Sequence, residues 1–240
     1  MDLTKTRSEL PILDPRLSSA VGFLRQGGVV CDVGTDHAYL PIYAILAGIS
    51  ERGIASDINK GPLMRAKENG DRYGVSDRLF YCLSDGLDGV EPEKNGITDV
   101  VICGMGGELI ARIVDDSRFT RKNGVRLILQ PMSMADELRK YLTENGFAIL
   151  DEAMSRAAGK VYSCICAEYT GGENTASYSD AELLLGRHNI AKGGALFREL
   201  AEKEIARLRK RIGGLKSGGY DAGAEETLLS EIERLAENQA

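Results

Sequence analysis

The segment from Asp32 to Ala38 combines side chains and a turn that could bind a small ligand and act on it. It follows a short apolar run, and Gly34 at that point would let the chain pass close to a bound nucleoside. Only Gly34 matches the dinucleotide-binding pattern Gly-x-Gly-x-x-Gly, so the sequence offers no grip for a pyrophosphate. The Asp36 carboxylate would repel phosphates, but it would tolerate a cofactor that lacks phosphates and carries a sulfonium. The alternative is a simple strand-to-helix turn with an aspartate cap.

Three further segments of this kind follow along the chain. Asp57 ends an apolar run 23 residues after Gly34, near the spacing at which an acid accepts hydrogen bonds from a ribose diol. Such an acid is also often a helix cap. Asp85, within Ser84-Asp85-Gly86, could accept a hydrogen bond from an adenine amino group. Residues 103–107, Cys-Gly-Met-Gly-Gly, hold three glycines that allow a backbone to approach a ligand closely.

The elements that must position these segments are short apolar runs alternating with amphipathic stretches between residues 29 and 169. Runs of four or five mostly apolar residues predict strands that are buried on both faces of a parallel sheet. We expect strands at 29–33, 53–57, 79–83, 99–103 and 126–130, and helices near 14–26, 39–48, 60–74, 106–116 and 133–145. All four candidate segments then lie at carboxyl ends of successive strands, on one rim of the sheet. A sharp turn remains the alternative for each of them.

Two more strand-like runs, 147–150 and 160–168, have only a short connection between them. A connection of that length cannot be a parallel crossover, so we expect this last pair to be antiparallel. Five parallel strands closed by an antiparallel hairpin predict the Rossmann-like α/β fold of the class I methyltransferases, a seven-stranded sheet with an antiparallel last strand. A nicotinamide-binding domain would instead continue with parallel units.

Beyond residue 170 the pattern becomes helical. The glycine-rich segment 170–175 is typical of a linker, and Ser179-Asp180 could cap a long helix that reaches about Ile212. Gly213-Gly214 and Gly218-Gly219 would break that helix, and 224–238 supplies a second one. We therefore predict two domains: a methyltransferase domain over 1–170 and a small C-terminal helical hairpin, of coiled-coil type, over 177–240.

The composition excludes several classes of protein. The chain has 240 residues, of which 43% are hydrophobic and 28% charged, as in an ordinary globular protein. No apolar run is long enough for a membrane span, and the first residues lack the apolar region of a signal peptide. Five cysteines without a Cys-x-x-Cys pair indicate neither a disulfide framework nor a zinc site. We expect a cytoplasmic protein that binds no metal and no membrane.

The net charge of −6 is unevenly distributed along the chain. Residues 187–216 carry nine basic and three acidic side chains, a local charge of +6, which leaves −12 for the rest. This asymmetry points to a polyanionic partner. The alternative is a solvated helix whose lysines and arginines simply face water.

Several motifs resemble those of bacterial tRNA (adenine-22-N1)-methyltransferases in sequence, order and spacing. They are Asp-Val-Gly-Thr-Asp-His-Ala-Tyr-Leu-Pro at 32–41, Asp-Ile-Asn-Lys-Gly-Pro-Leu at 57–63, Asp-Gly-Leu at 85–87, Gly-Met-Gly-Gly at 104–107 and Leu-Ile-Leu-Gln-Pro at 127–131. The resemblance covers roughly residues 10–170, and the helical hairpin matches in type more than in sequence. Where some members have Asn after the Gln-Pro pair, this chain has Met132.

The resemblance implies S-adenosylmethionine as the methyl donor and N1 of a tRNA adenine as the acceptor. The cofactor-binding residues that it implies are Arg16, Gly34, Thr35, Asp57, Ile58, Asp85, Gly86, Gly104 and Met105. Gly34 and Thr35 would pass under the methionine part, Asp57 would hold the ribose hydroxyls, and Ile58 would cover the adenine. Asp85 would take the adenine amino group and Gly104-Met105 would face the sulfonium. Arg16 could reach the methionine carboxylate or a phosphate.

For catalysis, neutral adenine N1 is already a nucleophile, so positioning for in-line attack would do most of the work. The product base is cationic, and a nearby carboxylate or neutral imidazole could stabilise that charge or take a proton from N6. Asp36, His37 and Tyr39 are the candidates. The alternative for His37 is a loop histidine that only satisfies local hydrogen bonds.

The expected partner is tRNA, and the residues expected to grip its phosphates are Arg198, Lys203, Arg207, Arg209, Lys210 and Arg211. The sequence leaves the oligomeric state open, with a monomer slightly favoured. Two other functions stay possible at this point. One is a small-molecule methyltransferase whose helical tail serves dimerisation, and the other is a non-catalytic RNA-binding module with a vestigial nucleoside pocket. The intact Asp57 and Asp85 argue against the second.

Overall fold

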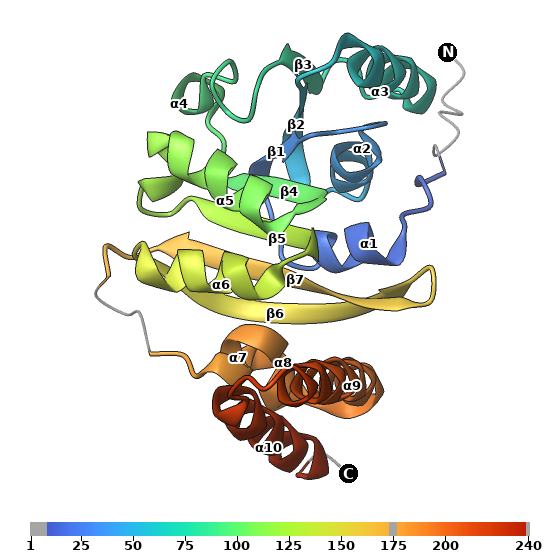
Figure 1. Cartoon of the computed structure of the whole chain (residues 1–240). Coiled ribbons are helices and arrows are strands. Elements are labelled where there is room, and N and C mark those ends of the chain that lie inside the picture. Colours follow the sequence, from blue (N-terminus) through green and yellow to red (C-terminus); the bar gives the residue numbers. More distant parts are fainter. Residues whose placement is uncertain (1–8, 173–176, 239–240) are drawn as a thin grey trace, which may run out of the picture.

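A computed structural model describes residues 9–172 and 177–238 of the chain. Its centre is a seven-stranded sheet in the order β3-β2-β1-β4-β5-β7-β6 (Figure 1). The strands are β1 (Gly28–Val33), β2 (Ser50–Asp57), β3 (Leu79–Leu83), β4 (Asp99–Gly106), β5 (Arg126–Ser133), β6 (Phe147–Ala157) and β7 (Lys160–Tyr169). The first five pair in parallel, and β7 pairs antiparallel with both β5 and β6. The predicted fold class is confirmed.

Helices cover both faces of this sheet. They are α1 (Pro15–Val21), α2 (Tyr39–Leu46), α3 (Lys60–Tyr73), α4 (Pro92–Asn95), α5 (Gly107–Asp116), the 3₁₀ helix η1 (Arg118–Arg121) and α6 (Ala135–Glu144). The cores on the two faces show which helix lies where: α5 and α6 pack on one face, and α1, α2 and α3 on the other. No helix of residues 9–172 or 177–238 is long and apolar enough to cross a membrane.

The central strand β1 is apolar apart from Asp32, because both faces of the sheet are covered. In β1 all six residues are buried. Val29 and Cys31 point into the core beneath α5 and α6, and Val30, between them, points into the core beneath α1 and α2. This is the two-sided burial that the non-alternating runs predict.

The first helix begins as predicted and ends earlier. The Asp14 side chain accepts a hydrogen bond from the Arg16 backbone N–H, and Pro15 occupies the first helical position. The helix ends at Val21, whereas the sequence pattern predicted a helix near 14–26. The following residues turn toward β1, and Arg25 donates to Asp99 and to the carbonyl oxygen of Gly124.

The long C-terminal helix that the sequence predicts is wrong in two respects. Three helices replace it: α7 (Asp180–Leu185), α8 (Arg187–Lys192) and α9 (Gly194–Ser217). The chain breaks at Gly186 and Gly193, which the sequence did not predict, and it does not break at Gly213-Gly214, which lie inside α9. The predicted break at Gly218-Gly219 is confirmed, because α9 ends at Ser217. The second predicted helix is present as α10 (Gly223–Glu237), and the cap at Ser179 is confirmed as a capping box with Glu182.

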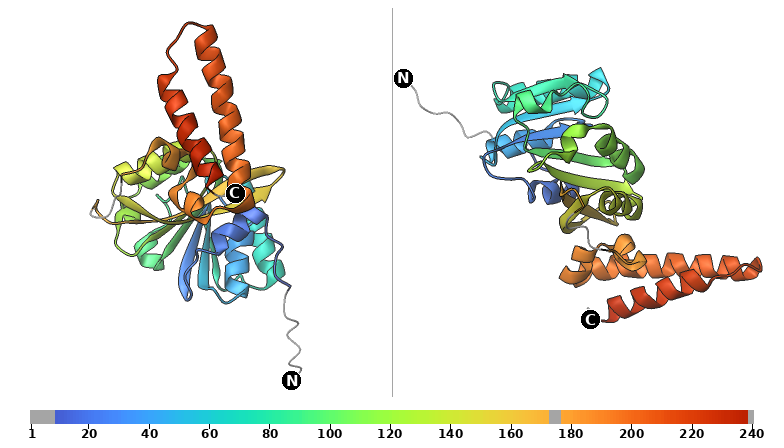
Figure 2. Two further views of the ribbon diagram at one scale, coloured as in Figure 1. Left: turned by 90° about the horizontal axis from the view of Figure 1, so that it is seen from below. Right: turned by 90° about the vertical axis from the view of Figure 1, so that its left-hand side faces the viewer.

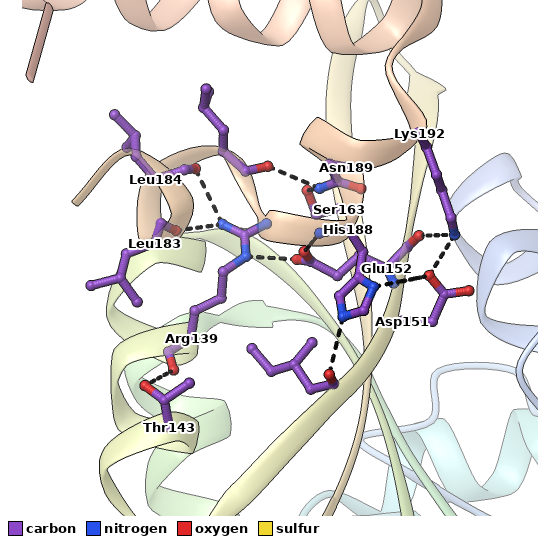
Figure 3. Close-up of polar contacts among 12 residues, drawn as sticks. Arg139, Thr143, Asp151, Glu152, Ser163, Leu183, Leu184, His188, Asn189 and Lys192 are labelled. Atoms are coloured by element: carbon purple, nitrogen blue, oxygen red, sulfur yellow. Dashed lines mark hydrogen bonds and ion pairs between the residues drawn. The ribbon is translucent and has the colours of Figure 1, made fainter. Parts of the chain in front are cut away.

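The break at Gly186 has a cause in the neighbouring sheet. Gly186 has φ +90°, and a side chain there would collide with the Glu152 carboxylate of β6. That carboxylate is fully buried, accepts from Arg139 Nε at 2.7 Å and from the His188 N–H at 3.2 Å (Figure 3). Arg139 in turn donates from Nη1 to the carbonyl oxygens of Leu183 and Leu184, at the end of α7. The cation thus meets a helix C-terminus and the anion a helix N-terminus.

A second set of contacts closes this junction between the sheet and the C-terminal helices. Lys192 Nζ lies 2.6 Å from the Asp151 carboxylate, and His188 Nε2 lies 3.1 Å from the Ile149 carbonyl oxygen (Figure 3). Asn189 donates to Ser163 on β7 at 3.1 Å. The helices beyond Ser177 are therefore fastened to β6 and β7 through polar contacts, of which those of Arg139, Glu152 and Asn189 are buried.

Helices α9 and α10 lie antiparallel and extend away from the body as a hairpin (Figure 2). Phe197, Leu208 and Ile232 form part of its core, to which Val161 of β7 also contributes. The predicted linker at 170–175 falls partly outside the described residues. The division into domains over 1–170 and 177–240 stays a prediction.

Candidate active site

The loops that follow β1, β2, β3 and β4 meet at one edge of the sheet, as the sequence predicts. Gly34 N and Thr35 N both donate to the Ser56 carbonyl oxygen, at 2.8 and 2.9 Å, which joins the first loop to the end of β2. Ser84 N donates to the Asp57 carbonyl oxygen at 3.0 Å, which joins the end of β2 to the third loop. The predicted cofactor-binding segments are thus neighbours in space.

The first and fourth loops touch across this edge. Gly34 has φ +76°, and a Cβ there would collide with Cε of Met105, so only glycine allows the Met105 side chain to lie over the turn. Gly104 has φ +79° and open space where its Cβ would be. Gly107 comes so close to the Met134 carbonyl oxygen that a side chain would not fit. The glycines at 104–107 therefore serve the approach of two loops as well as the approach of a ligand.

Gln130 holds the fourth loop in place, and sequence reasoning did not single it out. Its side chain is 1% exposed, accepts from Gly104 N at 3.2 Å and donates to the Pro131 carbonyl oxygen at 2.9 Å. A buried glutamine at the end of the apolar run 127–129 was the available signal, because a buried amide needs hydrogen-bond partners.

Asp32, the last polar residue before the first loop, is a second residue that the site assignment missed. Its side chain is 8% exposed. Burial raises the pKa of Asp32 to about 6, against a lowering by its hydrogen bond to Thr35, and the nearby Asp57 adds to the rise. Ionised in the free protein at neutral pH, this carboxylate is an anion with little solvent around it. A cationic group of a ligand would stabilise this carboxylate.

The end of β2 presents Asp57 and Ile58 to the same edge. Asp57 Oδ1 accepts from Asn59 N at 2.7 Å, which leaves its other carboxylate oxygen without a hydrogen-bond partner among the residues that the structure describes. Ile58 is 60% exposed, an unusual exposure for a large aliphatic side chain beside a site. Both positions agree with a ribose acceptor next to an apolar cover.

Asp85 and Gly86 line a small cavity of about 110 Å³ at the end of β3, together with Arg112 and Asp116 of α5. Arg112 Nη2 lies 3.5 Å from Asp85 Oδ1, so the Asp85 carboxylate already forms an ion pair with this arginine. Ser56 Oγ donates to the Gly86 carbonyl oxygen at 3.4 Å. An adenine amino group at Asp85 would therefore compete with Arg112.

The three candidate catalytic side chains form one cluster at the start of α2. His37 Nε2 lies 3.1 Å from Asp36 Oδ2, and the rings of His37 and Tyr39 stack with centroids 5.3 Å apart and planes 18° apart. Arg65 of α3, which the sequence reasoning missed, donates to the other Asp36 oxygen. Asn69, also on α3, donates to the His37 carbonyl oxygen at 3.0 Å. The cluster is thus held from α3.

Arg16 lies at the β4–β5 side of the edge. It is bonded to Asp14 at 2.8 Å and approaches Met132 Sδ at 2.7 Å. The hydrogen bond from Arg16 lowers the pKa of Asp14. Burial raises the pKa of the neighbouring Cys103 thiol well above its usual range, so this thiol is neutral.

The six predicted RNA-binding residues lie on the exposed surface of α9, and several of them are paired with acids. Arg207 bonds to Glu204 of its own helix at 2.6 Å, and Arg209 and Arg211 bond to Glu233 and Glu225 of α10 at 2.7 and 2.9 Å. Lys203 lies 3.9 Å from Glu204, and Lys210 has no ion-pair partner among residues 9–172 and 177–238. Residues 177–240 contain ten basic and eleven acidic side chains, so α10 cancels the charge of α9.

Three or more potential metal ligands do not gather anywhere in the described part of the chain.

Comparisons with known proteins agree with this geometry. A family model described as tRNA (adenine(22)-N(1))-methyltransferase matches residues 30–237. The tRNA (adenine(22)-N(1))-methyltransferase of Bacillus subtilis is 35% identical over 175 residues, which are 72% of this chain and 71% of that protein. The crystal structure of the B. subtilis m1A22 tRNA methyltransferase superposes with a TM-score of 0.79 at 28% identity, covering 96% of this chain and 99% of that one.

A Streptococcus pneumoniae protein solved in complex with S-adenosyl-L-methionine has a TM-score of 0.81 at 29% identity, over 92% of this chain and 99% of that chain. The family and the cofactor that the sequence motifs implied are confirmed. The chain therefore belongs to the tRNA (adenine(22)-N(1))-methyltransferase family.

Proposed function

We propose that the edge formed by the loops after β1, β2, β3 and β4 is the site at which this methyltransferase transfers the methyl group of S-adenosylmethionine to N1 of adenine 22 in tRNA. The observation that carries the proposal is the contact of the two glycine loops. Met105 lies over Gly34, and the end of β2 with Asp57 is bonded to the same turn. One ligand can therefore meet all three segments.

The residues at this edge fit the cofactor. S-adenosylmethionine supplies an electrophilic methyl group on a sulfonium, and it carries an ammonium and no phosphate. The buried Asp32 carboxylate offers an anion that an ammonium would neutralise, and the space beside Gly104 is open. Gly34 and Thr35 carry the chain beneath the ligand, the free Asp57 oxygen accepts from the ribose hydroxyls, and Ile58 covers the adenine. Asp85, Gly86 and Arg16 complete the set that the resemblance implies.

The acceptor base would meet the cluster at the start of α2. Arg65 fixes the Asp36 carboxylate, which leaves Asp36 suited to stabilise a cationic base rather than to move. His37 Nε2 donates to the Asp36 carboxylate and the ring stacks on Tyr39, so the ring orientation is set from two sides. A neutral His37 could take a proton from N6 of the product.

Asp57→Ala is expected to weaken S-adenosylmethionine binding about 10–100-fold without unfolding the protein, because two hydroxyls lose a charged acceptor worth about 1.5–3 kcal/mol. Calorimetric titration of the folded variant measures this. The matched control is Asp77→Ala, an exposed acid on the loop before β3. If Asp57→Ala binds the cofactor as tightly as the control does, Asp57 is only the partner of Asn59.

His37→Ala and Asp36→Ala are expected to slow turnover more than they weaken cofactor binding, because both side chains lie past the glycine turn. Single-turnover methylation of unmodified tRNA, read by mass spectrometry of its nucleosides, gives the rate and identifies the modified base. Wild-type rates in both variants would show that neither side chain takes part in the methyl transfer and that catalysis rests on positioning of the two substrates. Absence of 1-methyladenosine with the wild-type protein would contradict the function itself.

The hairpin α9–α10 belongs to this proposal as an RNA-binding arm. The exposed ion pair between Arg209 and Glu233 is worth less than about 1 kcal/mol, so this arginine can exchange its glutamate for a phosphate at little cost. The near-zero net charge of the arm leaves no long-range attraction to tRNA, however. The arm would therefore contribute to tRNA binding through direct contacts at a distance from the active site. A cytoplasmic location, where tRNA is modified, is part of the same proposal.

A further inference from the structure

Helix α3 gathers four cations on one exposed surface of the methyltransferase body. Its exposed face carries Lys60, Arg65, Lys67 and Arg72 against two acids, Glu68 and Asp71. Arg65 is bonded to Asp36. Within the described ranges 9–172 and 177–238, no carboxylate oxygen lies within 4 Å of a side-chain nitrogen of the other three cations. The Arg72 guanidinium lies over the Tyr73 ring, 5.1 Å from its centroid, a contact that leaves its charge unneutralised. This contrasts with α9, where most of the arginines are paired with glutamates.

The cations on α3 are arranged in two rows. Lys60 and Lys67 are seven residues apart, as are Arg65 and Arg72, so each pair spans two helical turns, about 10.5 Å, along one line of the helix. Ala66, Asn69 and Gly70 form the opposite, buried face. The helix is therefore fixed to the body, and both rows face solvent.

This helix is connected directly to the proposed catalytic cluster. It begins three residues after Asp57 and contributes Arg65 and Asn69, which hold Asp36 and the His37 backbone. Met64 is 65% exposed and lies between the two rows. Met64 shares that strip of the helix with Glu68 and Asp71, four and seven residues farther on, and its side chain offers a base an apolar surface to pack on. A phosphate bound by the first turns of α3 would thus lie beside the acceptor site, and Arg72 would contact the backbone about 18 Å farther along the helix.

The position of α3 relative to the active site and the hairpin allows its cations to contact a bound tRNA. α3 packs near β2 and β3, at one edge of the sheet, whereas the hairpin α9–α10 lies beyond β6, at the opposite edge (Figure 1). The proposed active site lies between them, at the ends of β1 to β4. A large polyanion seated on the active site can reach both.

We propose that α3 is a tRNA-binding surface of the methyltransferase body, on which Lys60, Lys67 and Arg72 contact successive phosphates of the backbone, beginning beside the target adenine. The proposal rests on the proposed function, because it takes tRNA as the substrate. It adds an anchor next to the reacting base, where the sequence analysis placed the grip only on the distant hairpin. Phosphate contacts of this kind release counterions, and so their loss shows in the salt dependence of binding.

The test uses the full-length protein and the triple variant Lys60→Gln/Lys67→Gln/Arg72→Gln. Binding of unmodified tRNA is measured at several salt concentrations. We expect affinity at 100 mM salt to fall by more than about tenfold, and the slope of log affinity against log salt to become shallower by about 2–3. The affinity for S-adenosylmethionine and the melting temperature are expected to stay at wild-type values. The value of kcat/KM for tRNA should fall more than kcat.

Two control variants make the result specific. Arg118→Gln/Lys140→Gln removes two other cations that have no acid partner in the described residues, and it is expected to leave the salt slope nearly unchanged. Arg209→Gln/Lys210→Gln/Arg211→Gln tests the arm. A wild-type slope in the α3 variant would overturn the proposal, as would an equal loss per charge in the Arg118/Lys140 variant. Loss only in the arm variant would overturn it while supporting the arm, and 1-methyladenosine formation by the wild-type protein tests the proposed function separately.

Discussion

Replacing Glu152 with leucine is expected to lower the free energy of unfolding by about 3–5 kcal/mol. The Glu152 and Arg139 side chains are 0% and 1% exposed, and 2.7 Å separate Oε1 from Nε. Removal of the acid leaves the Arg139 cation in the protein interior with no countercharge. It also leaves the His188 N–H, at the beginning of α8, without its acceptor.

Urea unfolding of the variant measures this loss, and a neighbouring pair provides the control. Arg126 and Glu168 lie 3.0 Å apart with side chains 25% and 23% exposed, so Glu168→Leu is expected to cost less than about 1 kcal/mol. Equal losses in the two single variants would contradict the role of burial.

The double variant Arg139→Met/Glu152→Leu separates two effects of removing Glu152: the loss of the attraction between the two ions, and the cost of leaving a buried arginine without a countercharge. It removes both ions, and we expect it to be more stable than Glu152→Leu alone. Recovery should be partial, because the Leu183 and Leu184 carbonyl oxygens lose the donor that Arg139 provides. A double variant less stable than Glu152→Leu would show that Arg139 stabilises the junction without its partner.

The body of the fold could be predicted because its determinants are local in the sequence. The six residues of β1 are all buried, and an apolar run without alternation reports that directly. The predicted strands 147–150 and 160–168 are too close in sequence for a parallel crossover, which predicts an antiparallel pair. In the structure β6 continues to Ala157, so only two residues separate it from β7. The location of the candidate site could be predicted from the same elements, because parallel strands bring their carboxyl ends to one edge of the sheet.

The C-terminal helices were less predictable because their breaks depend on residues far away in sequence. Gly186 ends a helix because the Glu152 carboxylate, 34 residues earlier, occupies the space beside it. Gly213 and Gly214 have open space around them, and with no partner that requires a turn the helix continues to Ser217. Charge counted along one segment also missed that α10 neutralises α9.

The residues missed at the site share the same reason. Arg65 acts on a loop 29 residues away, and the spacing between them reveals nothing of the contact. Gln130 acts across the boundary between two strands. Asp32 lies within an apolar run, where an acid is easily counted as part of the strand. Its burial, which the run itself predicts, was the signal that it carries a perturbed charge.

Asp32→Asn is expected to stabilise the free protein and to weaken its binding of S-adenosylmethionine. Burial raises the pKa of Asp32 from 3.8 to about 6. A raised carboxyl pKa means that the folded state favours the protonated form. The protonated Asp32 side chain therefore adds to the free energy of unfolding. This stabilisation is fully present below pH 3.8 and is lost as pH rises through 6. At pH 7 the ionised side chain therefore costs about 3 kcal/mol, which the neutral asparagine avoids.

The two effects are measured on the same pair of proteins. Unfolding at pH 4 and pH 7 without cofactor should show a stability difference between Asp32→Asn and wild type that is near zero at the lower pH and favours the variant by up to about 3 kcal/mol at the higher. Calorimetric titration at pH 7 should show a loss of cofactor affinity of about 10–100-fold, because the ligand ammonium loses its buried anion. Asp57→Asn, whose carboxylate is less buried, serves as the control and should weaken binding without stabilising the free protein. A variant that is less stable than wild type at pH 7, and that binds the cofactor normally, would reduce Asp32 to a hydrogen-bond acceptor for Thr35.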